Sequence, residues 1–349
     1  MRLRRSSPDC KLAEMTAQAN KRNGSVTFVL GAGASRSVSY AGTTDILSPL
    51  DRDFFDLLQR LEPRERDEAA VGWVLERMLG LPFEYRRSLE RTFYTLHLRS
   101  YLRRKLSGAD RTEEEAVVSH FARALVALLR KAHGVRVCDN HRYLLEGLDR
   151  NDAVISFNYD LVVERAVRGD AEARGAEFSP SIYRLQPDIL PPPALAKILK
   201  LHGSVNWDLN GDQFRVRTTC WDDLDDTPGY RGYSGEGTRF PIFLPFWDKQ
   251  VTRGPWLPLW KKAHQQLQRT NYIIVWGFSL PATDVKAREL LTISIPDGGT
   301  DKRLCVIDPS QSARDRWREL LPSAQYWEYE NIRAFRSAPP GWWWRVERP

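Results

Sequence analysis

The hydrophobic pattern along the chain alternates between short apolar runs and longer amphipathic segments. Five apolar runs of four to six residues, rich in β-branched side chains, are typical of strands buried on both faces. These runs are 25–30, 152–157, 198–201, 272–276 and 303–307. Helical patterns lie between several of them. This order predicts an α/β fold, a Rossmann-like parallel sheet with helices on both faces.

The segment from residue 53 to residue 150 has a different pattern. Its apolar residues recur at spacings of three and four, as in Val71, Val74 and Met78, and no strand is predicted within it. We therefore predict an inserted helical subdomain, 53–150, which we expect to form a pocket wall or an oligomer surface. The other parts are a leader, 1–24; the Rossmann-like domain, 25–52 and 151–335; and a tail, 336–349.

Several connecting elements are predicted less directly. Segments 169–193 and 208–258 are rich in Gly, Pro and Asp and are expected to be loops, with a β-hairpin around 214–219. Helices are expected from Leu161, over Trp260–Arg269 and after a cap near Asp284. The tail carries Trp342-Trp343-Trp344, and we favour its packing onto its own domain over an interface with a partner.

Composition and charge exclude several classes of protein. The 349 residues carry a net charge of +7, but acidic residues are interspersed with basic ones even in the Arg-rich stretch 84–104. A solvated helix face fits that stretch better than a nucleic-acid patch, and a modestly positive surface favours an anionic dinucleotide. The four cysteines form no close pair, so no metal site is predicted. No run suits a signal peptide or a membrane span, and we expect a cytoplasmic protein.

Polar residues follow the predicted strands where each one ends. Because the carboxyl ends of parallel strands share one edge of a sheet, these residues are expected to meet in one site. After the first strand, Gly31-Ala32-Gly33-Ala34-Ser35 forms a small-residue turn before a helix, which suits a pyrophosphate. Residue 36 is Arg, so the turn lacks the third glycine of the dehydrogenase pattern.

Two further strand ends carry the candidate reactive groups. Asn158 follows the second strand and can hold a water or a ribose hydroxyl, while Asp160 can bind a carboxamide or cap the next helix. His202 follows the third strand, and imidazole titrates near neutral pH, so it is the candidate base. Gly203 is expected to keep the approach to His202 open.

The last two strand ends offer additional ligand contacts. Gly277 and Ser279 are placed to contact phosphate or ribose, although Ser279 is equally suited to a turn hydroxyl. Asp308 closes the fifth strand and either reaches ribose or adenine or forms an Asp-Pro turn. These alternatives stay open at the level of sequence.

Four segments in this order, 31–35, 157–160, 201–207 and 276–284, resemble the sirtuin-like domain of bacterial NAD-degrading proteins of anti-phage defence. The resemblance spans residues 26–309. It implies NAD+ as the substrate, Asn158 and His202 as catalytic residues, and Ser35 with the two glycines at the phosphates. It also implies Asp160 near the nicotinamide end and Asp51 as the acidic residue before the insert.

The expected reaction is hydrolysis of the nicotinamide–ribose bond, giving nicotinamide and ADP-ribose, within an abortive-infection response. Because unrestrained NAD+ loss kills the host, we expect control by homo-oligomerisation or by a regulatory partner such as an ATPase subunit or a phage component. Two rivals remain: a protein deacylase, disfavoured because the four-cysteine zinc module is missing, and a non-catalytic NAD or ADP-ribose sensor.

Overall fold

The structure is a computed structural model that describes residues 24–36, 46–62, 68–110, 112–133, 137–173, 180–183, 196–210, 213–216, 254–295 and 302–343. The predicted leader lies outside these ranges apart from Gly24. So does Trp344 of the tail. Within the described residues, no helix is both long and apolar enough to cross a membrane.

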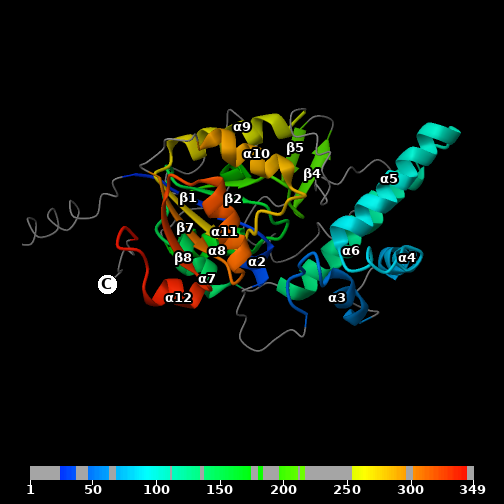
Figure 1. The fold of residues 1–349 in the computed structure, drawn as a ribbon, viewed down its shortest axis with the longest axis horizontal. Helices are drawn as coiled ribbons and strands as arrows, with labels where there is room; N and C mark the ends of the chain where they lie inside the picture. The colour runs from blue at the N-terminus through cyan, green and yellow to red at the C-terminus, as the bar shows by residue number, and fades with distance from the viewer. Residues whose placement is uncertain are drawn as a thin grey trace, which may run out of the picture.

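A six-stranded parallel sheet forms the centre of the protein (Figure 1), which confirms the predicted fold class. Its order is β3-β2-β1-β6-β7-β8, with neighbouring strands parallel throughout. The strands are β1 (Val26–Leu30), β2 (Ala153–Ser156), β3 (Lys197–Lys200), β6 (Tyr272–Trp276), β7 (Arg303–Ile307) and β8 (Gln325–Tyr329). Five were predicted. The edge strand β8 was missed because its residues are partly exposed and form no apolar run.

Helices cover both faces of this sheet (Figure 1). α9 and α10 pack together on one face, and α7 packs against α8 on the other, where α12 also lies. The helices are α7 (Asp139–Leu145), α8 (Val162–Ala173), α9 (Trp256–Arg269), α10 (Val285–Ser294), α11 (Gln311–Leu320) and α12 (Ile332–Ser337). Contact between α7 and α8 means that the end of the predicted insert packs with the Rossmann-like body.

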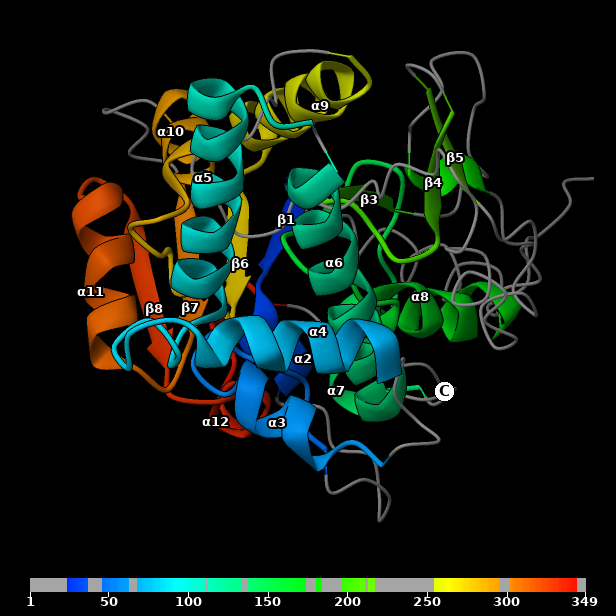
Figure 2. The same cartoon turned by 90° about the vertical axis from the view of Figure 1, so that its right-hand side faces the viewer.

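The rest of the insert is a group of helices at one side of the sheet, which Figure 2 shows from that side. These are α3 (Phe54–Arg60), α4 (Glu68–Leu79), α5 (Leu89–Ser107) and α6 (Thr112–His133). α6 packs against α3, α4 and α5. The described part of the insert contains no strand, as the periodicity predicted. Its buried apolar residues join the core of the sheet domain.

Three predicted connections were wrong in their bounds. α8 continues through Gly169 to Ala173, and a short 3-10 helix, η2 (Pro180–Tyr183), also lies within the supposed loop. The hairpin is β4 (Trp207–Asn210) with β5 (Gln213–Val216), earlier than expected. α9 begins at Trp256 rather than Trp260. Pro258 is tolerated there because first-turn N–H groups have no partner within the helix.

The order of the strands fixes where a ligand can bind. From β1 the chain adds β2 and β3 on one side, then crosses to add β6, β7 and β8 on the other. The sheet therefore reverses its direction of growth between β1 and β6. In open parallel sheets, ligands bind in the crevice at the carboxyl ends of the strands beside such a switch point.

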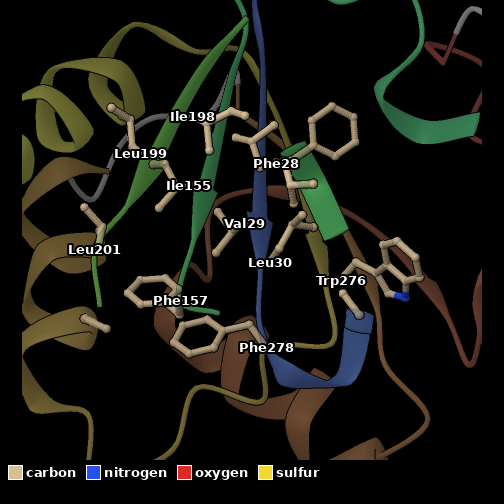
Figure 3. Packing of buried hydrophobic residues seen from close by; sticks show 14 of the residues in the cluster. Phe28, Val29, Leu30, Ile155, Phe157, Ile198, Leu199, Leu201, Trp276 and Phe278 are labelled. Carbon is tan, nitrogen blue, oxygen red and sulfur yellow. The ribbon is translucent and has the colours of Figure 1, made fainter. Parts of the chain in front are cut away.

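Apolar side chains fill the space under this crevice and around the strands. Phe28 and Leu30 of β1 pack among the neighbouring strands, and the rings of Phe157 and Phe278 lie together at the strand ends (Figure 3). The tail packs onto the same domain, as favoured from sequence. Trp342 is buried and stacks on Tyr272, with ring centroids 4.9 Å apart.

The buried His141 of α7 makes the stability of the fold depend on pH. Its ring lies on Trp276 with centroids 4.4 Å apart, and Nδ1 is 3.2 Å from Sγ of Cys138. Burial, only partly offset by the charge of Asp160 and reinforced by that of His133, lowers the pKa of His141 from 6.5 to about 3. The unfolded chain therefore binds a proton between these values that the folded chain does not.

We expect the free energy of unfolding to fall as pH drops from about 6.5 towards 3, with His141 contributing up to about 1.4 kcal/mol per pH unit. Urea denaturation at several pH values measures this slope. His141→Gln should make the slope shallower. Equal slopes in wild type and His141→Gln would show that His141 is not the responsible group.

Candidate active site

Two glycine turns meet at the switch point and hold the centre of the site together. The first follows β1 and leads into α2 (Ala32–Arg36), and the second follows β6. Gly31 N–H donates to the carbonyl of Trp276 at 3.2 Å, and Gly33 N–H donates to the carbonyl of Gly277 at 2.9 Å. A Cβ on Gly277 would lie 2.0 Å from the nitrogen of Ala34, and one on Gly31 would lie 2.6 Å from Gly277 O.

The glycines therefore serve first to bring two backbones together. Gly277 also has φ +63°, in the left-handed region that glycine adopts without strain. The N–H groups of Gly31, Gly33 and Ala34 all donate to backbone carbonyls. From the sequence, the amides of this turn were predicted to bind a phosphate. In the structure the amides of Gly31 and Gly33 hold the two turns together, and the amide of Ala34 closes the first turn by donating to Gly31. Gly31, Ala32 and Gly33 still line the cavity described below.

A directed chain of hydrogen bonds orients Asn158. Its Nδ2 donates to the carbonyl of Gly31 and to Oγ of Ser35, both at 2.9 Å. Ser35 Oγ donates in turn to Oδ2 of Asp160 at 2.7 Å. Asn158 and Ser35 are buried, and Asp160 is 4% exposed. Both amide protons of Asn158 are thus used within the protein, and the atom left for a ligand is the acceptor Oδ1.

The ionised state of Asp160 fixes the direction of this chain. Burial alone would raise the pKa of Asp160, but His133, Lys200, the Ser35 hydroxyl and the Val162 N–H together lower it. Burial lowers the pKa of His133 itself. A carboxylate only accepts hydrogen bonds, so Ser35 must donate to it and must accept from Asn158. The amide of Asn158 is therefore held against rotation.

A second buried network supports Asp160 from behind. Lys200, at the end of β3, donates to the carbonyl of Asp160 and pairs with Oε1 of Glu164 at 3.2 Å. Tyr183 donates to the same oxygen at 3.0 Å and accepts from Nδ2 of Asn206. Lys200 and Glu164 are both fully buried. Removing one member would leave an uncompensated buried charge. The pair ties the end of β3 to α8, the helix that follows β2.

His202 lies at the end of β3, beside this network. Its Nε2 is 3.0 Å from Oδ2 of Asp284, and both side chains are below 10% exposed. The edge of Phe157 meets the imidazole at 5.0 Å, and the ring of Tyr159 stacks on it at 6.1 Å between centroids. Gly203 has φ +88° and does not line the cavity. Its place is in the turn that follows His202, where its amide donates to the carbonyl of Lys200.

A cavity of about 630 Å³ gathers these strand ends. Ten of the twelve residues predicted for the site line it, and Ser35 and Gly203 do not. The ten are Gly31, Ala32, Gly33, Asp51, Asn158, Asp160, His202, Gly277, Ser279 and Asp308. Such a volume suits a cofactor-sized ligand. The insert supplies one wall through Leu89 and Glu90 of α5 and Leu125 and Leu129 of α6, which is the pocket-wall role expected from sequence.

Three of the predicted carboxylates also have structural partners. Asp160 Oδ1 accepts the N–H of Val162 at the start of α8, so the capping alternative is confirmed. Asp308 Oδ1 accepts the N–H of Ser310 at 2.9 Å, the expected Asp-Pro turn. Asp51 Oδ1 accepts from the Ser88 hydroxyl and the Glu90 N–H at the start of α5. Each of these carboxylates lines the cavity as well.

Asp284, Arg36 and Glu90 are among the cavity residues that were not predicted for the site. Asp284 had been assigned only to the cap of α10, and its pairing with His202 needs the tertiary structure. Arg36 had been noted only because it breaks the glycine pattern. Arg36 lines the cavity, and its guanidinium pairs with Asp53 through NH2 at 2.7 Å and donates to the carbonyl of Ser48 through NH1. Glu90 comes from the insert, which sequence reasoning left apart from the chemistry.

The free cysteines Cys138 and Cys305 are both buried. Cys10 and Cys220 lie outside the described residues. In the part of the chain that the structure describes, no three His, Cys, Asp or Glu side chains come together as a metal site would require.

Comparison with known proteins yields only distant structural likeness. No family model matches the chain, and no curated protein does. The chain is similar to solved structures of Sir2 with the inhibitor EX-527, 2′-O-acetyl-ADP-ribose and a deacetylated p53 peptide (14% identity, 93% of this chain and 98% of that chain, TM-score 0.41). It is also similar to Sir2 with a p53 peptide and NAD+, with 15% identity, coverage of 93% of this chain and 98% of that chain, and a TM-score of 0.41. A third similar structure is Sir2Tm bound to a propionylated peptide, with 15% identity, coverage of 94% of this chain and 96% of that chain, and a TM-score of 0.42. Likeness at this level identifies no function.

The contact between the glycine turns can be tested by adding one methyl group. Gly277→Ala should destabilise the fold by more than about 4 kcal/mol or prevent folding, because the new Cβ meets backbone and φ is positive. Gly72→Ala is the matched control: it sits inside α4, and beyond the backbone of its own helix turn no atom lies within 4 Å of the added Cβ. That change should stabilise by about 0.5–1 kcal/mol. Chemical denaturation of both variants measures the difference, and a Gly277→Ala loss below about 1 kcal/mol would contradict the interlocked packing.

Proposed function

We propose that this protein is an NAD+ glycohydrolase that cleaves the nicotinamide–ribose bond to give nicotinamide and ADP-ribose. The observation that carries the proposal is the meeting of Asn158 and His202, from the ends of two strands, in one cavity at the switch point of the sheet. In the proposed reaction the sheltered imidazole would act as the base and the oriented amide oxygen would accept a hydrogen bond from the attacking water or the ribose, with no metal taking part.

The strand order supports one direction for the dinucleotide. The pyrophosphate would lie at the centre, against the turn of Gly31 and Gly33 and the guanidinium of Arg36. Asn158 and His202 follow β2 and β3, so the nicotinamide ribose would lie on that side. Ser279 and Asp308 follow β6 and β7, and the adenosine would extend towards them. The Asp308 carboxylate would accept hydrogen bonds from the adenosine ribose.

In the proposed reaction, the bond between ribose C1′ and the nicotinamide nitrogen breaks, and the electron pair leaves with nicotinamide. The ring nitrogen is cationic in NAD+, so the leaving group departs neutral. Positive charge develops on the ribose and is offset when His202 accepts a proton from a ribose hydroxyl or from the attacking water. Asn158 Oδ1 accepts a hydrogen bond from that water or from the ribose. Water adds its hydroxyl to C1′, and one proton is released.

The biological setting is part of the same proposal. Depletion of NAD+ by an effector of this kind would serve anti-phage defence through death of the infected cell. The helical insert supports a point of control, because it carries Leu89 and Glu90 into the cavity wall. Self-association, or binding of a regulatory partner such as an ATPase subunit, at this insert would change the shape of the cavity.

The first test is NAD+ turnover by the purified protein. Wild type should release nicotinamide and ADP-ribose in equal amounts, and Asn158→Ala and His202→Ala should each reduce kcat on the order of 10²-fold or more. His264→Gln, outside the cavity, should keep wild-type activity. Liquid chromatography quantifies both products.

The same assay separates the rivals. Consumption of NAD+ only in the presence of an acyl-lysine peptide, with transfer of the acyl group to ADP-ribose, would favour the deacylase. NAD+ binding without turnover, unchanged in both variants and across protein concentrations, would favour a sensor. An Asn158→Ala protein with wild-type turnover would remove the proposed role of that amide.

Arg36 supplies a separate prediction about substrate binding. Arg36→Gln removes a positive charge from the cavity wall and should raise KM for NAD+ about tenfold or more, with a smaller effect on kcat. Asp53→Asn is the matched control, since it breaks the ion pair at 2.7 Å but keeps the guanidinium. Steady-state kinetics of both variants measures the changes in KM and in kcat separately. Equal KM values in wild type and Arg36→Gln would place the pyrophosphate elsewhere.

A further inference from the structure

The ion pair between His202 and Asp284 joins two distant parts of the chain inside the cavity wall. His202 follows β3, and Asp284 precedes α10. The distance between Nε2 and Oδ2 is 3.0 Å, and the two side chains are 9% and 6% exposed. Because water is largely excluded from both, their interaction is stronger than that of a surface pair.

The turn before α10 holds Asp284 in a fixed orientation. Its N–H donates to the carbonyl of Pro281, and its Oδ1 accepts the N–H of Ala287 at 3.3 Å, which caps α10. Leu280, which is fully buried, has φ +52° and is the one residue other than glycine with a positive φ among those the structure describes. Strained backbone of this kind persists where the surroundings hold it, and it is concentrated at functional sites.

We infer that Asp284 is a positioning residue that holds His202 in the tautomer with its proton on Nε2. This inference rests on the proposed function. A carboxylate accepting from Nε2–H places the lone pair of the neutral ring on Nδ1, which becomes the basic atom. The negative charge also stabilises the imidazolium that forms when His202 takes a proton. Oδ1 of Asp284 caps α10 while Oδ2 orients the imidazole, so the two oxygens have separate tasks.

The other titratable groups around the pair do not replace Asp284. Tyr159 stacks on the imidazole, and burial together with the charges of Asp284 and Glu90 raises its pKa well above the usual value, so it stays neutral. Glu90, from α5, accepts a hydrogen bond from Thr283, the neighbour of Asp284. The carboxylate of Asp160 is bound to Ser35 and to α8. The ion pair with His202 is made by Asp284.

Asp284→Asn separates positioning from capping, because asparagine caps helices as well as aspartate. We expect the variant to keep its Tm within a few degrees and to lose kcat on the order of 10²-fold, with KM for NAD+ changed less than about threefold. The acid limb of the pH profile should move to lower pH, since the imidazolium loses its carboxylate. Asn331→Ala removes a cap at α12, away from the cavity, and should leave kcat and the pH profile unchanged.

Nuclear magnetic resonance of 15N-labelled histidine provides a second measurement that does not depend on turnover. In wild type the His202 shifts should report a protonated Nε2 and an unprotonated Nδ1, and Asp284→Asn should lower the pKa of this residue. A wild-type His202 protonated on Nδ1, or an Asp284→Asn protein with unchanged kcat and His202 pKa, would overturn the inference. If wild type bound NAD+ without cleaving it, the proposed function would fail, while the tautomer and pKa would still decide the role of Asp284.

Discussion

The contact between the two glycine turns is the constraint on which the site depends. Gly33 N–H reaches the carbonyl of Gly277, and the missing side chains allow the backbones after β1 and β6 to approach. These two strands are neighbours across the switch point, so their turns form the floor of the crevice. Asn158 is bound to this floor through the carbonyl of Gly31. A side chain at Gly277 would therefore disturb the amide as well as the sheet.

The buried charges of Lys200 and Asp160 determine which groups donate and which accept in the hydrogen bonds at the cavity. Lys200 holds the backbone carbonyl of Asp160, and its charge helps to keep that carboxylate ionised. The ionised carboxylate makes Ser35 a donor, and Ser35 makes the Asn158 amide point its oxygen away from the chain of bonds. In the same cavity wall Asp284 pairs with His202. Fixed dipoles of this kind need no rearrangement when charge develops in a reaction.

The helical insert is part of the site rather than an appendage to it. Asp51, just before the insert, binds the start of α5, and this contact brings Glu90 to the cavity and to Thr283. Thr283 adjoins Asp284, the partner of His202. A displacement of α5 would thus reach His202 through two contacts, the hydrogen bond between Thr283 and Glu90 and the ion pair between Asp284 and His202.

The sequence by itself determined the fold class, five of the six strands and the gathering of polar residues at one edge of the sheet. Periodicity reports burial, and parallel strands place their carboxyl ends together, so these features follow from local pattern and topology. It did not determine β8, whose half-exposed residues carry no apolar run, or the start of α9, where a proline is tolerated in the first turn. Only the tertiary structure decided the roles within the site. The pairing of His202 with Asp284, the use of the Gly33 amide in packing and the fixed direction of the Asn158 amide depend on contacts between residues that are distant in sequence, and local patterns contain no record of such contacts.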